Sequence, residues 1–226
     1  MILHPIEQRS EAWYSVRAGK ITGTRFAQMM MKHSTQGYKD LITDLAAESI
    51  TETQDAGGYV SEDMQRGIDL EPMAVKAYKD ELNKKGIDVG FIEPNEDHEF
   101  FGWIGISPDH LIIDDNIVYI DDNDNEIIEY EGLLEVKCPK LKTHFNYICD
   151  DRLPNKYKYQ VQAQLYVTSL DYVDFMSFYP SQKIKPFIIR VKKDPIIHES
   201  FEAQLRHLIP LVKEKIEIYK NYNHLV

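Results

Sequence analysis

Residues 133–139 read Leu-Leu-Glu-Val-Lys-Cys-Pro, and the prediction of the fold starts from this stretch. Its first two residues, Leu133 and Leu134, are apolar, and Pro139 ends the stretch because proline cannot donate a hydrogen bond to a β-ladder. Side chains alternate between the two faces of a strand, so Glu135 and Lys137 point the same way and Val136 points into the opposite layer. The stretch therefore predicts a strand that presents one acid and one base on the same surface.

A second acid lies in the sequence Ser-Pro-Asp at residues 107–109, 26 residues before Glu135. Asp109 is expected to open another strand, and its carboxylate meets that of Glu135 if the two strands are neighbours. Two converging carboxylates form a hard oxygen site that suits Mg²⁺. A divalent ion activates water and stabilises charge on a phosphate, as phosphodiester hydrolysis requires. Lys137 is then placed to orient or deprotonate the attacking water, since a nearby cation lowers the pKa of a lysine.

The Glu-x-Lys tripeptide is a weak signal on its own, because a chain of this length holds roughly one by chance. The alternative is a solvated strand face that carries one acid and one base. Three features favour the catalytic interpretation: the apolar start at residues 133–134, the proline after the motif, and the proline before Asp109. We therefore predict a metal-dependent hydrolytic centre formed by Asp109, Glu135 and Lys137.

Two more candidates for this centre come from predicted helices. Tyr157 and Gln160 share one face of a helix over residues 155–168, where Gln160 is expected to steady a metal-bound water or a metal ligand. The alternative is an ordinary amphipathic helix. Glu71 is a candidate third acid at the metal cluster, and its alternative is a solvated glutamate favoured by the helix dipole.

A separate candidate is a phosphate site near the N-terminus. Arg17 is followed by a glycine turn and by a helix start that bears Thr22 and Thr24. A helix N-terminus supplies N–H groups and an arginine supplies a two-pronged donor, so this segment is predicted to receive a phosphate. The alternative is a surface arginine beside a capped helix.

The spacing of apolar residues along the rest of the chain predicts a single domain over residues 1–226, of the α/β (α+β) class with a central mixed sheet flanked by helices. Pro72 and Pro210 are expected to kink the helices that hold them. The expected helices cover 10–18, 22–31, 38–50, 61–86, 143–150, 155–168 and a long stretch from Pro195 that Asp194 caps; the expected strands cover 87–92, 100–104, 110–113, 117–120, 126–130, 133–136, 172–179 and 187–191.

The net charge of −11 argues at first against a nucleic-acid partner. Eight of the acidic residues lie in a predicted acidic β-hairpin insertion at 114–131, which contains no lysine or arginine, whereas residues 137–158 have a balance of +4. Screening limits distant charges to about 8–10 Å of influence, so a DNA site can be locally positive. No membrane-length apolar run or signal peptide is present, which predicts a cytoplasmic protein. Cys138 and Cys149 are expected to be free thiols.

Five motifs in this order resemble the phage lambda exonuclease family, or YqaJ-like viral recombinases, within the PD-(D/E)xK nuclease superfamily. The resemblance covers about residues 10–170 and implies a restriction-endonuclease-like fold. Its most specific pair is S-P-D with E-x-K-C-P. The motifs are W-x(3)-R-x-G-x-I-T from Trp13, G-x(3)-E ending at Glu71, S-P-D at 107–109, E-x-K-C-P at 135–139 and Y-x(2)-Q-V-Q from Tyr157.

The resemblance implies a role for each matched residue. Metal would be bound by the carboxylates of Asp109 and Glu135 and by the backbone carbonyl of Val136, with two Mg²⁺ ions expected and Mn²⁺ as an alternative. Lys137 would serve the attacking water. The remaining implied roles are the metal cluster for Glu71, the lining of the site for Tyr157 and Gln160, and the 5′-phosphate of the substrate end for Arg17, Thr24 and Ser107.

The resemblance also implies a function and partners. The family digests one strand of linear duplex DNA from its 5′ end, leaves a 3′ overhang and passes it to a single-strand annealing protein. A ring-shaped homotrimer in the cytoplasm of a bacterial host is the implied assembly, for a phage-derived protein. The sequence departs from the family in the longer spacing between Asp109 and Glu135, which the acidic residues 114–131 occupy, and this puts the trimer in doubt more than the activity.

Two other functions fit parts of the pattern. One is another nuclease of the same superfamily, RecB-like or endonucleolytic, and its discriminating property is cleavage without a free 5′ end. The other is a non-catalytic DNA-end-binding module, which would be expected to have lost a metal ligand or the lysine. Since Asp109, Glu135 and Lys137 are all present, the exonuclease is preferred.

Overall fold

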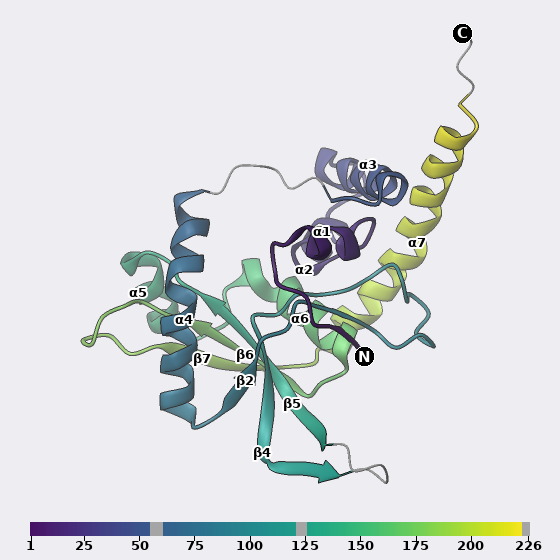
Figure 1. Cartoon of the computed structure of the whole chain (residues 1–226). Helices are drawn as coiled ribbons and strands as arrows, with labels where there is room; N and C mark the ends of the chain where they lie inside the picture. Colours follow the sequence, from purple (N-terminus) through teal and green to yellow (C-terminus); the bar gives the residue numbers. More distant parts are fainter. Residues whose placement is uncertain (55–60, 121–125, 223–226) are drawn as a thin grey trace.

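A five-stranded mixed sheet in the order β2-β4-β5-β6-β7 forms the centre of the protein (Figure 1). The computed structural model describes residues 1–54, 61–120 and 126–222, with the backbone alone for 114–120 and 126–129. β5 and β6 run parallel and the other neighbours antiparallel, which confirms the predicted fold class. The strands are β2 (Lys85–Ile87), β4 (His110–Ile120), β5 (Glu126–Lys137), β6 (Tyr172–Ser177) and β7 (Phe187–Lys192).

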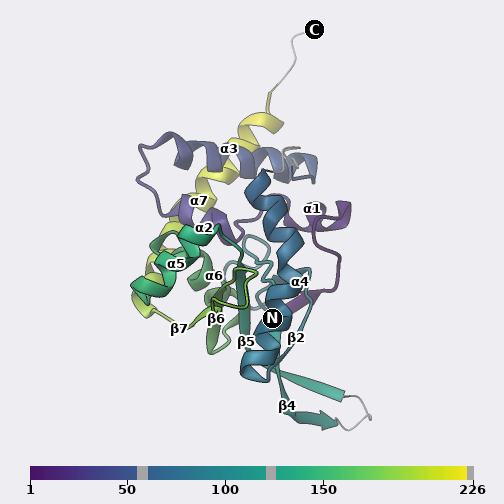
Figure 2. The same ribbon diagram turned by 90° about the vertical axis from the view of Figure 1, so that its left-hand side faces the viewer.

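Helices cover both faces of this sheet (Figures 1 and 2). On one face, α4 (Glu62–Leu82) packs Val75 and Tyr78 against Leu134 of β5. The other face packs Leu133 of β5 against a larger core. That core includes residues of α2 (Gly23–Met29), α3 (Gln36–Thr51), α6 (Lys158–Thr168) and α7 (Pro195–Lys220).

The crossover between the parallel strands β5 and β6 contains α5 (Leu141–Asp150), a short 3-10 helix η1 (Asn155–Tyr157) and α6. Parallel neighbours need such a connection, because a tight turn cannot join them. All residues of α6 from Val161 to Thr168 are buried, so this helix lies between the sheet and the outer helices. The crossover therefore brings the side chains of α6 over the last residues of β5.

The N-terminal segment forms a second, two-stranded sheet, in which β1 (Ile2–His4) pairs with β3 (Phe91–Glu93). It is followed by α1 (Glu11–Arg17). Isolated bridges join Ile21 to Ile104 and Ile92 to Ile106, and they attach this segment to the loop that leads into β4. The loop that carries residues 107–109 is thereby held next to α1.

Helix caps follow the sequence in most places. Ser61 accepts a hydrogen bond from the amide of Met64, and Asp194 accepts bonds from the amides of Ile196 and Ile197, as expected for capping residues. α4 and α7 run through Pro72 and Pro210 as continuous helices. α4 ends at Leu82, before the predicted end at residue 86, because Asn83 adopts a left-handed conformation.

The strand boundaries differ more from prediction. The strand predicted at 100–104 is wrong, because hydrogen bonds from Phe101 to His98 and from Trp103 to Phe100 fold this stretch into turns. The strand predicted at 87–92 divides between β2 and β3, which belong to different sheets. The four strands predicted over 110–136 form only two, β4 and β5, whose register shifts between Ile113 and Val118.

β4 and β5 together form a hairpin whose outer part projects from the body of the protein (Figure 1). The predicted acidic turn at 121–125 lies outside the described residues. Within the described residues, none of the helices is long and apolar enough to cross a membrane. Both cysteines are free, with Cys138 buried and Cys149 exposed.

Candidate active site

The last residues of β5 place an acid and a base on the face covered by α6. The carboxylate of Glu135 accepts hydrogen bonds from Gln160 Nε2 at 2.6 Å and from Gln164 Nε2 at 2.5 Å, both on α6. Lys137 Nζ also donates to Glu135, through an ion pair in which the glutamate side chain is 1% exposed and that of the lysine 25%. Val136 packs on the other face with residues of α4, as strand alternation requires.

Asp109 joins this pair from the start of β4. The register pairs His110 with Leu134, so the preceding residue lies beside Glu135. The amide of Val136 donates to Asp109 Oδ2 at 2.6 Å. The two segments that were separated by 26 residues in the sequence thus meet at one end of the sheet.

Negative charge exceeds positive charge around these residues. Burial and the neighbouring Glu135 carboxylate raise the pKa of Asp109 well above its ordinary value. Burial also raises the pKa of Glu71 on α4, although Arg9 and Lys137 oppose that shift. Burial disfavours the charge on Lys137, but Glu135 and Asp109 outweigh it and raise the pKa of the ammonium. The cluster therefore places three acids, Asp109, Glu135 and Glu71, around Lys137.

A cleft of about 430 Å³ opens onto this cluster. α4 contributes Glu71 to one wall, and the start of α5 contributes Lys140 and Thr143 to the other. Lys140 Nζ lies 3.3 Å from Asp63 Oδ1, so one exposed ion pair links the two walls. The remaining lining residues are Arg9, Asp63, Met64, Gly67, Ile68, Asp109, Val136, Lys137, Cys138, Pro139, Lys156 and Tyr157.

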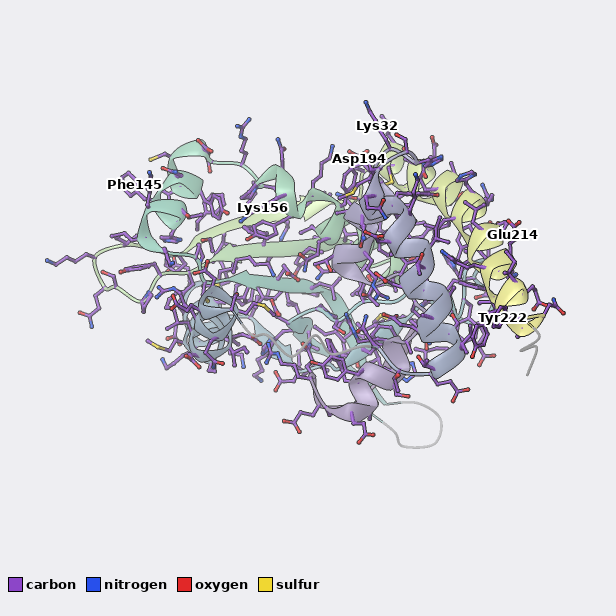
Figure 3. The ribbon with its side chains drawn as sticks, turned by 90° about the horizontal axis from the view of Figure 1, so that it is seen from above. Lys32, Phe145, Lys156, Asp194, Glu214 and Tyr222 are labelled. Carbon is purple, nitrogen blue, oxygen red and sulfur yellow. The ribbon has the colours of Figure 1, made fainter. Side chains whose placement is uncertain are left out.

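Aromatic and cationic groups flank the cleft on the α6 side. The ring centroid of Tyr157 lies 5.5 Å from Lys137 Nζ and 4.7 Å from Lys156 Nζ. Seen from above, Lys156 lies over the sheet beside α5, whereas Phe145 of α5 points outward (Figure 3). Tyr157 thus connects the catalytic lysine candidate with a second cation at the same cleft.

The donor set fits a hard divalent cation. Among the described residues, no group of three or more His, Cys, Asp and Glu side chains is arranged to hold a metal ion. The candidate ligands are those that the family resemblance implies, the two carboxylates of Asp109 and Glu135 with the backbone carbonyl of Val136. A cation at this point would relieve the repulsion that raises the pKa of Asp109, and carboxylates with carbonyl oxygens are the ligands that Mg²⁺ prefers.

A second polar cluster surrounds Arg17 at the end of α1. Its guanidinium donates to Ser107 Oγ at 3.0 Å, to Thr22 Oγ1 at 3.1 Å and to Gln54 Oε1 at 3.1 Å. It also lies 3.9 Å from the ring centroid of Trp13, whose Nε1 donates to the same serine hydroxyl. Burial, with a smaller contribution from the charge of Arg25, lowers the pKa of Arg17 to about 10.

The predicted phosphate-binding residues do not all meet in this cluster. Arg17 and Ser107 do, but Thr24 is exposed on α2, and it is Thr22 that contacts the arginine. Thr22 precedes α2 without a side-chain cap bond, because its hydroxyl is engaged by Arg17 instead. A threonine two residues earlier than the predicted one thus lies in the cluster.

The turn after Arg17 is held by a buried acid. Glu48 of α3 accepts from the amide of Gly19 at 3.1 Å and from Arg25 Nη1 at 2.7 Å. Gly19 has a φ of +69°, and a Cβ there would lie 2.3 Å from Ser49 Oγ, so only glycine fits this turn. Glu48 therefore fixes the path between α1 and α2.

Arg9 was not among the predicted site residues. Its side chain lines the cleft, and its charge opposes the rise that burial causes in the pKa of Glu71. It also lines a second cavity of about 750 Å³ that shares Glu71 and Asp109 with the cleft. Arg9 adopts a left-handed backbone conformation with φ of 70°. No sequence signal marks this position, because arginine is not a residue that such turns favour.

Comparisons with known proteins identify the family of the chain. The YqaJ-like viral recombinase domain matches residues 12–171. The chain is similar to an alkaline exonuclease (LHK-Exo) from Laribacter hongkongensis, with 26% identity, a TM-score of 0.74, and coverage of 93% of this chain and 96% of that one. The structure of LHK-Exo in complex with dAMP gives a TM-score of 0.73 at the same identity and coverage.

A phage related exonuclease from Haemophilus somnus 129PT has the same fold, with 11% identity, a TM-score of 0.57, and coverage of 88% of this chain and 96% of that one. None of the curated proteins matches the sequence. The matched domain spans the segments that carry Arg17, Asp109, Glu135 and Lys137, so the predicted resemblance is confirmed. The chain belongs to the YqaJ-like viral recombinase family.

Proposed function

We propose that this protein is a Mg²⁺-dependent exonuclease that digests one strand of linear double-stranded DNA from the 5′ end and leaves 3′ single-stranded overhangs. The family and the likeness to an alkaline exonuclease support a nuclease that acts on DNA. The finer proposal depends on one observation. The segment 107–109 joins the two polar clusters, since Ser107 contacts Arg17 and Asp109 contacts the end of β5.

Each residue of the acidic cluster has a separate task in this proposal. Asp109, Glu135 and the Val136 carbonyl would hold the cation, and two ions are expected in the loaded site. When bound, Mg²⁺ or Mn²⁺ supplies Lewis acidity and lowers the pKa of a water molecule. Lys137 donates a hydrogen bond to Glu135 in the structure, and the same ammonium would orient the attacking water. Tyr157 and Gln160 keep Lys137 and Glu135 in place.

The Arg17 cluster would receive the terminal 5′-phosphate. A guanidinium matches two phosphate oxygens with parallel hydrogen bonds, and Ser107 and Thr22 supply hydroxyl donors. A phosphate held there would direct the neighbouring phosphodiester towards Asp109, which follows Ser107 by two residues in the protein chain. Such an arrangement would favour a start at the 5′ end and the release of mononucleotides.

The experiment that tests the proposal compares three substrates in the presence of Mg²⁺: linear duplex with 5′-phosphate, linear duplex with 5′-hydroxyl, and closed circular duplex. We expect loss of one strand from the 5′-phosphorylated ends and no cleavage of circles. Cleavage of circles would instead assign the protein to the endonucleolytic branch, and end binding without cleavage would assign a non-catalytic role.

The role of Arg17 can be tested separately. Replacement of Arg17 by alanine is expected to remove the preference for 5′-phosphorylated over 5′-hydroxyl ends, because a charge-assisted pair contributes about 1.5–3 kcal/mol, or roughly tenfold to 150-fold in rate. Arg152→Ala, on the exposed turn after α5, is the matched control and should keep the preference. A preference that survives in the Arg17 variant would place the phosphate site elsewhere.

We extend the proposal to the partners that the family implies: a single-strand annealing protein that takes the 3′ overhang, and a second and third copy of this chain in a ring, in the cytoplasm of a bacterial host. The protruding β4–β5 hairpin carries the longer spacing between Asp109 and Glu135 that puts the ring in doubt (Figure 1). The mass in solution tests the ring, because a trimer has three times the 26.4 kDa of one chain.

A further inference from the structure

Two buried glutamines on α6 differ sharply in what they contact. Gln162 and Gln164 are 3% and 1% exposed, and residues two positions apart on a helix point to nearly opposite sides. Gln162 faces the start of α7, and Gln164 faces β5. The two positions therefore offer a comparison between equally buried amides in one helix.

Gln162 has its hydrogen-bonding capacity filled by the backbone and a histidine. Its Nε2 donates to the carbonyl of Lys192 at 2.9 Å, and its Oε1 accepts from the amide of Asp194 at 2.9 Å. The ring of His198 lies 3.0 Å from the same oxygen. Gln162 thus ties β7 to the first turn of α7 and has an evident structural role.

Gln164 makes a single side-chain hydrogen bond, from Nε2 to Glu135 Oε2 at 2.5 Å. Its Oε1 is buried and has no hydrogen-bond partner among the described residues. A buried carbonyl oxygen without a partner is unfavourable, and an apolar side chain of the same shape would avoid it. Packing alone therefore does not account for an amide at this position, whereas the bond to Glu135 does.

The two carboxylate oxygens of Glu135 are held from different sides. Oε1 accepts from Lys137 and from Gln160. Oε2 accepts from Gln164. Lys137 lines the cleft, whereas the buried Glu135 and Gln164 do not, so the amide of Gln164 holds the carboxylate at the oxygen that Lys137 does not contact.

We propose that Gln164 is a positioning residue that fixes the orientation of the Glu135 carboxylate for a divalent cation, without touching cation or substrate. This inference rests on the proposed metal-dependent function. A carboxylate held at one oxygen alone can rotate, so a cation must order it on binding. Loss of a hydrogen bond that orients a metal ligand typically lowers metal affinity about 10- to 100-fold.

The test measures Mn²⁺ binding to the DNA-free protein by titration calorimetry, with the melting temperature as a second measurement. Gln164→Met keeps the volume of the side chain and removes the donor. Gln162→Met makes the same change at the control position and strands the carbonyl of Lys192. We expect Gln164→Met to weaken Mn²⁺ binding about tenfold. Its melting temperature is expected to fall as well, because Glu135 Oε2 loses a donor, so the Mn²⁺ affinity is the measurement that separates the two variants. We expect Gln162→Met to lower the melting temperature and to leave Mn²⁺ affinity within about twofold of wild type.

The outcomes separate this inference from the proposed function. An unchanged Mn²⁺ affinity in Gln164→Met, or an equal loss in both variants, overturns the positioning role while the metal-dependent function stands. A wild-type protein that binds no Mn²⁺ overturns both. Should Gln164→Met fail to fold, Gln164→Asn replaces it, because the shorter amide cannot reach Glu135 and is expected to show the same loss of affinity.

Discussion

Two buried carboxylates on neighbouring strands of the sheet have opposite surroundings. Glu135 on β5 and Asp174 on β6 are each 1% exposed, and the register places Asp174 beside Leu134, on the α4 face. Arg190 donates to both oxygens of Asp174 at 2.8 Å, and Tyr78 Oη donates to Oδ2 at 2.7 Å. This cluster is closed, with one acid matched by one arginine.

The cluster around Glu135 is left incomplete by comparison. Asp109 and Glu71 add two acids, Lys137 is the one cation bonded to Glu135, and a cleft opens beside them. Buried charge is stable when it is paired, so the excess of acids at one end of β5 is a cost that folding alone does not explain. The difference supports a stabilising role for the Asp174 cluster, and it supports the proposal that the Glu135 cluster binds a cation.

The largest expected effect comes from removing Lys137 from the cluster around Glu135. Lys137→Ala should lower the cleavage rate by about 10²- to 10⁴-fold, the usual contribution of a residue that serves the attacking water. DNA binding should remain nearly intact, since the phosphate cluster around Arg17 is untouched. Single-turnover cleavage and filter binding measure the two separately.

The matched control is a second lysine at the same cleft. Within the described residues, Lys156 lies over the rings of Tyr147 and Tyr157 and not beside the acids, so Lys156→Ala should weaken binding in a salt-dependent way and leave the single-turnover rate largely unchanged. Wild-type rates in Lys137→Ala would remove this lysine from the site.

The second effect concerns stability of the closed cluster. Asp174→Asn should lower the free energy of unfolding by about 1–2 kcal/mol, because the buried carboxylate loses its charge-assisted hydrogen bonds whereas Arg190, whose side chain is 45% exposed, keeps water as a partner. Cleavage per folded molecule should not change, as Asp174 faces α4 and not the cleft. Urea unfolding, monitored by tryptophan fluorescence, measures the free energy of unfolding. A stable but inactive variant would contradict the division between the two clusters.

An Asp→Asn substitution in the cluster around Glu135 should change the free energy of unfolding in the opposite direction. Asp109→Asn removes one of the repelling carboxylates and keeps an oxygen that can accept from the amide of Val136. The metal-free protein should gain about 1 kcal/mol of stability and lose cleavage, as is common at strained active sites. Mg²⁺ should then raise the melting temperature of wild type and not that of the variant. A loss of stability in metal-free Asp109→Asn would show that its carboxylate is structurally required.

Strand periodicity was sufficient to predict the strand that holds Glu135 and Lys137, because alternation assigns faces without knowledge of the neighbours. The meeting of Asp109 with β5 was predicted from the motif pair and depends on the pairing of β4 with β5. The predicted phosphate segment included both Thr22 and Thr24, but the family resemblance assigned the role to Thr24 alone, since the sequence does not show which of the two hydroxyls reaches Arg17. Arg9 and the contact of Gln164 depend on the packing of distant segments, which leaves no local signal.

The smallest expected effect concerns the buried histidine His144, which is hydrogen-bonded without a carboxylate partner. His144 of α5 is fully buried, with Nδ1 2.8 Å from Ser177 Oγ on β6 and Nε2 3.2 Å from the carbonyl of Lys185. Burial lowers the pKa of His144 below its ordinary value of 6.5. The unfolded chain then binds the proton more readily than the folded one, so this contribution to stability is present above pH 6.5 and is lost as the pH falls through the folded-state pKa.

His144→Gln should therefore flatten the decline of stability between about pH 7 and pH 5, where an unperturbed histidine titrates. Urea midpoints at a series of pH values measure that slope, and His33→Gln, at an exposed position, should keep the wild-type slope. Arg190 remains charged throughout this range because its hydrogen bonds to Asp174 raise its pKa, so the closed ion pair does not contribute to the slope through the arginine. An identical slope in His144→Gln would mean that groups other than His144 cause the loss of stability in acid.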